Sequence, residues 1–218
     1  MPAPLPAFTP EEFGRALAAR SPEPLSPTVV DSLYQHYQEL VRWNRTISLV
    51  GPGTADEVIA RHYGEALAAL PLLPPGAREA VDVGSGAGFP GIVLAAVRPG
   101  LHVTLCEARG RKWSFLAAAA RRASLPCRCL NARVSLPLPT GLPDAIDLVT
   151  ARAVRLEPEV LGALASRLTP GGRVLLWVGE ETPDLPSNLT PDRELPLAGS
   201  ARRRILALRR TESPSETG

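Results

Sequence analysis

The stretch VDVGSGAGFPG, residues 81–91, decides the fold. A short apolar run leads directly into a cluster of glycines, which is typical of a buried strand that ends in a tight loop. Two patterns overlap there: D-x-G-x-G-x-G, formed by Asp82, Gly84, Gly86 and Gly88, and G-x-G-x-x-G, formed by Gly86, Gly88 and Gly91. Such loops let the backbone approach a ligand closely. The stretch therefore predicts a ligand site after the first strand of an α/β sheet.

The segments that follow alternate between strand and helix patterns. We expect strands at 80–83, 102–107, 127–131, 147–153 and 173–179, and helices at 91–97, 111–125 and 157–168. RELPLAG (193–199) and RRRILALRR (202–210) indicate an antiparallel pair that turns at Gly199-Ser200. This order predicts a doubly wound, Rossmann-like α/β fold with a mostly parallel, seven-stranded sheet whose last strand is antiparallel.

The first 75 residues read as a helical extension. Thr9 and Ser26 are N-cap residues that each precede a proline, and a further helical stretch covers residues 54–73. The sequence thus predicts a helical extension over 1–75, a ligand-binding domain over 76–210 and a polar, disordered tail over 211–218.

Composition sets limits on function. The 218 residues carry a formal net charge of +2, so the average charge shows no strong nucleic-acid footprint. We see neither a signal peptide nor an apolar run of about 20 residues, and we expect a cytoplasmic monomer that does not bind membranes. Cys106, Cys127 and Cys129 suit buried, reduced thiols better than a disulfide framework, and no metal site is expected.

Three features favour S-adenosyl-L-methionine over a nicotinamide dinucleotide as ligand. Glu107 lies 19 positions after Gly88 and suits the ribose of either cofactor, so it does not separate them. The loop, however, follows a long helical segment. Asp82 can face a methionine ammonium, whereas it would repel a pyrophosphate. LTPGGRVLLWVG (168–179) resembles the L-x-P-G-G-x-L element common in class I methyltransferases.

A closer resemblance rests on five motifs in order: RWNRTISL, ARHYGEAL, VDVGSGAGFPGIVLAAVRP, GRKWSFL and TARA. They resemble the RsmG (GidB) family, class I enzymes that methylate N7 of a guanine in the 530 loop of 16S ribosomal RNA. The likeness covers residues 30–210. It implies S-adenosyl-L-methionine as cofactor, and 16S rRNA or the small ribosomal subunit as partner.

The residue patterns and the resemblance together indicate roles for single residues. The expected cofactor-binding residues are Asp82, Gly84, Ser85, Gly86, Gly88, Phe89, Glu107, Ala108, Arg133, Val134 and Arg152. Arg152, His62 and Asn44 are expected at the reaction centre. The expected RNA-binding residues are Arg61, Arg109, Arg111, Lys112, Arg202, Arg203 and Arg204.

Some positions depart from the family pattern. Glu65 and Ala66 replace an aspartate and a serine, and Ser135 replaces an acidic residue. Val178 stands where the family has a lysine before the glycine that ends the fifth strand. These departures leave open a methyltransferase of another substrate and a cofactor-binding regulator without activity. A nicotinamide oxidoreductase is a third alternative.

The implied chemistry needs no general base, because guanine N7 carries a free lone pair. Alignment of the reacting atoms can supply roughly 7–11 kcal/mol. Arg152 is the main candidate, as a donor to guanine O6 or to a flanking phosphate, although a surface ion pair is the alternative. His62 suits helix packing equally well, and Trp43 suits the core better than base stacking. The arginines at 202–204 could instead protect an exposed edge strand.

Overall fold

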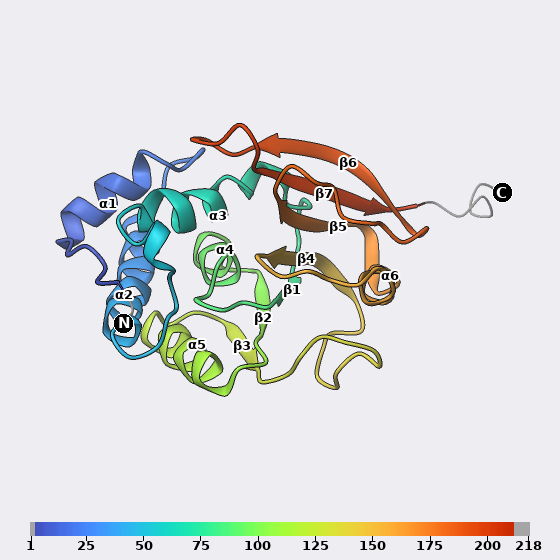
Figure 1. Cartoon of the computed structure of the whole chain (residues 1–218), viewed down its shortest axis with the longest axis horizontal. Coiled ribbons are helices and arrows are strands. Elements are labelled where there is room, and N and C mark those ends of the chain that lie inside the picture. The colour runs from blue at the N-terminus through green and yellow to red at the C-terminus, as the bar shows by residue number, and fades with distance from the viewer. Residues whose placement is uncertain (1–2, 212–218) are drawn as a thin grey trace.

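The protein is a seven-stranded α/β sheet flanked by helices on both faces, seen in a computed structural model that describes residues 3–211 (Figure 1). The strand order is β3-β2-β1-β4-β5-β7-β6. The strands are β1 (Glu79–Val83), β2 (His102–Cys106), β3 (Cys127–Leu130), β4 (Ile146–Arg152), β5 (Leu168–Val178), β6 (Leu189–Pro196) and β7 (Arg204–Arg210). Strands β1 to β5 pair in parallel. The predicted doubly wound sheet is confirmed.

The antiparallel strand lies inside the sheet rather than at its edge. β7 pairs antiparallel with both β5 and β6, and it separates them. The pair predicted around Gly199-Ser200 is therefore present, but β6 begins earlier than predicted, at Leu189. β5 also begins earlier, so residues 168–172 lie in the strand where the sequence indicated a turn.

The helices divide between the two faces of the sheet. They are α1 (Pro10–Ala18), α2 (Pro27–Asn44), α3 (Glu65–Leu67), α4 (Gly91–Val97), α5 (Gly110–Arg122) and α6 (Pro158–Ala165). Leu148 faces the core that contains α1, α2, α4 and α5, whereas the next residue, Val149, faces the core that contains α6. This alternation follows from the two-residue period of a strand. The N-terminal helices thus share one apolar core with one face of the sheet.

The N-terminal helices begin where the sequence predicted. Thr9 and Glu12 form a capping box at α1, and the Ser26 side chain accepts from the Val29 amide at α2. The predicted helix over 54–73 is broken into short pieces instead. They are 3₁₀ turns η1 (Pro52–Thr54) and η3 (Leu70–Leu72), the π-helix η2 (Ile59–Gly64) and α3. π-helical turns are rare and frequently lie at functional sites.

The end of the chain lies partly outside the described structure. Of the predicted tail over 211–218, only Thr211 falls within residues 3–211, and the rest lies outside the described residues. None of the helices in residues 3–211 combines the length and apolar character that crossing a bilayer requires.

Candidate active site

A cavity of about 450 Å³ opens at the carboxyl ends of β1, β2 and β4. Ligands of open α/β sheets bind at this edge, and the volume lies within the range of small-molecule sites. Its lining contains most of the residues expected there: His62, Gly84, Ser85, Gly86, Phe89, Glu107, Ala108, Arg109, Lys112, Arg133, Val134 and Arg152. The structure therefore brings together residues that are up to 90 positions apart in the sequence.

The glycine loop forms one wall of this cavity. Gly84 has φ +71°, and a Cβ there would lie 3.2 Å from the side chain of Val154 across the cavity wall. The amides of Gly84 and Ser85 both donate to the Cys106 carbonyl at the end of β2. Because Gly84 has no side chain, the loop leaves room for a ligand, and its hydrogen bonds to the end of β2 fix its position.

Glu107 is buried directly after β2. Its Oε2 accepts from the Gly86 amide at 3.0 Å, and its Oε1 accepts from the Arg109 amide at 2.8 Å. Each carboxylate oxygen can accept more than one hydrogen bond. The carboxylate is therefore oriented by the backbone while it keeps acceptor capacity toward the cavity that it lines.

Asp82 does not line the cavity, contrary to the expectation that it faces a ligand ammonium. It is 1% exposed beneath the loop, where its Oδ1 accepts from the Thr150 hydroxyl at 2.6 Å. Its Oδ2 has no hydrogen-bond partner within residues 3–211. Burial raises the pKa of Asp82, and the Thr150 hydrogen bond opposes that shift. Asp82 therefore joins β1 to β4 under the loop. Gly88 also lies outside the lining, against Ile92 and His36.

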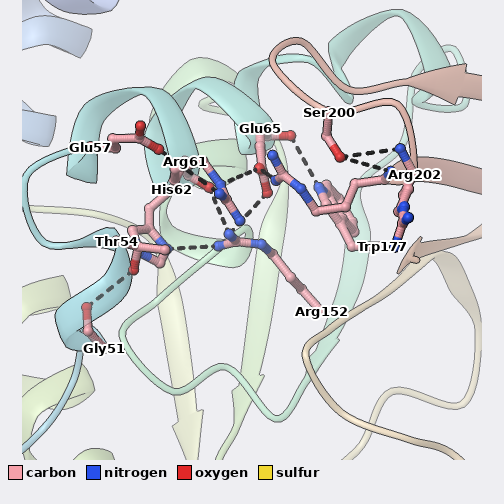
Figure 2. Close-up of polar contacts among 11 residues, drawn as sticks. Gly51, Thr54, Glu57, Arg61, His62, Glu65, Arg152, Trp177, Ser200 and Arg202 are labelled. Carbon is pink, nitrogen blue, oxygen red and sulfur yellow. Dashed lines mark hydrogen bonds and ion pairs between the residues drawn. The ribbon is translucent and has the colours of Figure 1, made fainter. Parts of the chain in front are cut away.

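Arg152 is anchored in a cluster around the buried carboxylate of Glu65. Its guanidinium donates to His62 Nδ1 at 3.0 Å, to the Arg61 carbonyl at 2.6 Å and to Glu65 Oε2 at 3.0 Å. Figure 2 shows Arg61, His62 and Glu65 of the helical segment pointing toward Arg152 at the end of β4. Burial lowers the pKa of Arg152 to about 10, so the group stays charged at neutral pH. The surface ion-pair alternative does not describe this arrangement.

The Glu65 cluster also joins the last hairpin to the helical extension. Glu65 Oε1 accepts from Arg61 Nε at 3.1 Å and from Arg203, while the indole of Trp177 donates to its carbonyl at 3.1 Å. Three arginines thus surround one carboxylate whose side chain is only 7% exposed. Glu57, 3.9 Å from Arg61, adds a second carboxylate to this cluster.

His62 is held neutral between two partners. Its Nδ1 accepts from Arg152, so Nε2 carries the proton and donates to the Thr54 hydroxyl at 3.0 Å. Its ring stacks on Phe89 with centroids 5.2 Å apart. Burial, followed by the charges of Arg152 and Arg61, lowers the pKa of His62 to about 3. His62 therefore packs two elements together and lines the cavity at the same time.

Asn44 does not line the cavity, contrary to the expectation that it takes part in the reaction. It is 2% exposed, and its Oδ1 accepts from the amides of Leu49 and Val50. Its Nδ2 donates to the Ala3 carbonyl. All of these partners are backbone groups, so Asn44 closes the end of α2. Trp43 packs against the core, as favoured from the sequence.

The expected RNA-binding residues fall into two groups. Arg109 and Lys112 line the cavity, and Arg111 is exposed beside them. The hairpin arginines are instead engaged within the protein. Arg203 binds Glu65, Arg202 lies 3.5 Å from Glu180, and Arg204 donates to the segment that follows β5. Arg61 lies in the Glu65 cluster rather than on the cavity wall.

Sequence reasoning missed three residues that organise this site: Glu65, Thr150 and His36. Glu65 stood out only as a departure from a motif. His36 on α2 contacts the Ala87 carbonyl of the glycine loop at 3.0 Å and the Tyr63 hydroxyl at 2.7 Å. Their partners lie far away in sequence, so no local pattern could have found them.

The described residues carry no metal-binding constellation. No group of three or more His, Cys, Asp or Glu side chains within residues 3–211 is placed to hold a metal ion. The three cysteines are free thiols, and burial raises the pKa of Cys106 to about 12. The groups of the site can bind, orient and neutralise a ligand.

Comparison with known proteins places this chain in a family. Residues 30–188 match the GidB family, described as rRNA small subunit methyltransferase G. The protein of that name from Paramagnetospirillum magneticum is 37% identical over 161 residues, which cover 73% of this chain and 76% of that protein. The one from Xanthomonas axonopodis pv. citri is 36% identical over 189 residues, covering 84% and 85%.

The fold comparison reaches beyond that family. The structure of the mitomycin 7-O-methyltransferase MmcR superposes with a TM-score of 0.53 at 20% identity, covering 97% of this chain and 74% of that one. This likeness supports the class I methyltransferase fold alone. The family match spans more than half of the chain, from α2 through the glycine loop to the residue before β6. The chain belongs to the GidB family of small-subunit ribosomal RNA methyltransferases.

Proposed function

We propose that this protein transfers a methyl group from S-adenosyl-L-methionine to N7 of a guanine in the 530 loop of 16S rRNA. The observation that carries the proposal is the cavity after β1, which joins a glycine loop, a buried carboxylate at the end of β2 and a cluster of arginines. Family membership supports the reaction class, and the resemblance of the motifs supports the base and its position.

The cavity fits S-adenosyl-L-methionine on two observations. Its wall at Gly84 is a cradle that a Cβ would narrow, and Glu107 presents an oriented carboxylate suited to a pair of ribose hydroxyls. Ala108, Arg133 and Val134 line the part of the cavity next to Glu107, where the adenosine would lie. Bound there, the cofactor supplies an activated methyl group on a sulfonium.

The residues of the chain act by orientation and charge. Guanine N7 needs no proton removed before it attacks a methyl carbon, so the reaction needs no general base. The low pKa of His62, about 3, makes this histidine a weak base and agrees with that requirement. Arg152 is fixed by three acceptors, so it presents a rigid positive charge at the cavity edge. Fixed charge and alignment can supply most of the barrier reduction that such a transfer needs.

The proposal is tested with small subunits from a strain that lacks this gene. The purified protein is incubated with subunits and S-adenosyl-L-methionine labelled in the methyl group, and label in 16S rRNA is counted. We expect one methyl per subunit, and at least a tenfold lower rate for Arg152→Ala. Arg121→Ala, an exposed position on α5, is the control and should leave the rate unchanged. An unlabelled rRNA, with cofactor binding intact by calorimetry, would refute the proposal.

A further inference from the structure

A second cavity adjoins the first at the carboxyl ends of β4 and β5. It encloses about 680 Å³ and shares residues 153–156 with the first cavity as a common wall. Ala153 in this wall has φ +56°, one of two non-glycine residues with a left-handed backbone in residues 3–211. Such conformations persist only where the surroundings impose them and gather at functional sites. Here the anchored Arg152 precedes the turn.

The second cavity combines apolar side chains and three carboxylates with one arginine, Arg155, which lies in the wall shared with the first cavity. Val154, Leu156, Trp177 and Val178 form much of the wall, and Val154 remains 41% exposed. The rim carries the carboxylates of Glu180, Glu181 and Asp184. Three carboxylates against one arginine leave this lining negatively charged, which repels a phosphate, whereas its apolar side chains suit the faces of a planar base. The cavity therefore selects a base rather than the RNA backbone.

The shape of guanine fixes how it would lie between the two cavities. N7 and the N1–H and N2–H donors lie on opposite sides of the base. With N7 at the shared wall, these donors face the acidic rim, where a carboxylate can accept both. Glu181 has no hydrogen bond or ion pair within residues 3–211, whereas Glu180 lies 3.5 Å from Arg202. Asp184 is likewise without such a partner within these residues, but Glu181 lies between Glu180 and Thr182, which Arg204 holds, so Glu181 is the acceptor whose neighbours are fixed.

Arg204 holds the segment that carries these carboxylates. It lies opposite Val178 in the β5–β7 register. Its guanidinium donates to the Thr182 hydroxyl at 2.7 Å, to the Glu180 carbonyl at 3.3 Å and to the Gly179 carbonyl. Its Nε lies 3.2 Å from Glu194. Arg204 was expected to bind RNA, but these contacts use it to fix residues 179–182 over the second cavity.

We propose that the second cavity receives the acceptor guanine, that Glu181 reads its N1–H and N2–H donors, and that Arg204 positions Glu181. The inference rests on the proposed function for the identity of the base. During transfer the bond from N7 to the methyl carbon forms, the carbon–sulfur bond breaks and its electron pair stays on sulfur. The positive charge moves onto the guanine ring, where a carboxylate hydrogen-bonded to N1–H stabilises it.

The first test compares matched variants in methyl transfer to unmodified small subunits. Glu181→Gln should lower kcat/KM by about tenfold, with the dissociation constant for S-adenosyl-L-methionine unchanged. Glu159→Gln, an exposed position on α6, is its control. Arg204→Ala should raise KM for the subunit relative to Arg209→Ala, an exposed arginine on the same strand. Equal rates for Glu181→Gln and Glu159→Gln would overturn the proposal.

A second readout needs no catalysis. In saturation-transfer NMR, guanosine monophosphate should bind more strongly than inosine monophosphate, which lacks the N2 amine, and Glu181→Gln should abolish the difference. If rRNA receives no methyl group but this discrimination is present, the cavity assignment stands and the proposed reaction fails. If rRNA is methylated but neither readout responds to Glu181→Gln, the proposed reaction stands and this inference fails.

Discussion

Acid should weaken the fold through His36, the histidine beneath the glycine loop. Its side chain is fully buried, and its two ring nitrogens contact the Ala87 carbonyl and the Tyr63 hydroxyl. Only the neutral ring with its proton on Nε2 satisfies both, because the carbonyl must accept and the hydroxyl can donate. Burial lowers the pKa of His36 to about 4. The folded protein therefore keeps this ring neutral at a pH where a free histidine is charged.

The magnitude follows from the two pKa values. An unfolded histidine titrates near ~6.5, so the unfolded chain takes up a proton between pH 7 and pH 5 while the folded chain does not. Because the unfolded state binds more protons in this window, stability falls as the pH falls. The shift to about 4 corresponds to a loss on the order of 2 kcal/mol between pH 7 and pH 5.

Urea unfolding of the wild-type protein and His36→Gln, at pH 7 and at pH 5, measures this effect. At pH 7 the variant should be less stable by about 1–3 kcal/mol, since a buried polar group loses its partner. At pH 5 that gap should shrink by on the order of 2 kcal/mol. His62 is present in both proteins, so its own titration cancels. His102→Gln, at an exposed position, is the control. A gap that stays constant between the two pH values would refute the reasoning.

Three further predictions concern Gly91 after the glycine loop, the carboxylate of Glu107 and the Glu65 cluster. Gly91→Ala should cost about 1–3 kcal/mol in urea unfolding, because its Cβ would lie 2.4 Å from Leu105; the same loss in Gly100→Ala, where nothing lies within 4 Å, would contradict this. Glu107→Gln should weaken S-adenosyl-L-methionine binding by about tenfold in calorimetry, and an unchanged affinity would count against the ribose assignment. Glu65→Gln should lower the free energy of unfolding by about 3 kcal/mol, because the substitution leaves the arginine partners of Glu65 unpaired. A loss below about 1 kcal/mol would show that these ion pairs do not stabilise the fold.

The sequence predicts those parts of the fold that local chemistry determines. The end of β1 and the loop after it follow from an apolar run that meets glycines, and the start of α1 follows from the Thr9 capping box. The position of β7 between β5 and β6 does not follow, since neighbours in a sheet are set by contacts between distant segments. The π-helix over residues 59–64 also escapes local patterns; it carries His62, whose partner Arg152 lies 90 positions away in the sequence.

The candidate site divides in the same way. Glu107 is placed correctly by its spacing from the loop, because the carboxyl ends of parallel strands meet at one edge. Asp82 and Asn44 carry polar side chains within motifs, yet both are turned inward and bind buried groups of the protein. Arg203 and Arg204 look like exposed charges in the sequence, but their partners on other elements engage them. Such pairings become visible only in three dimensions.

The most direct test of the central claim is to locate the methyl group on the RNA. Small subunits from a strain that lacks this gene are treated with the protein and S-adenosyl-L-methionine, and the 16S rRNA is cleaved by borohydride and aniline, which cut at 7-methylguanosine. The account predicts one new cut, in the 530 loop, that is lost with Arg152→Ala. A methylated rRNA without that cut, or a cut elsewhere, would contradict it.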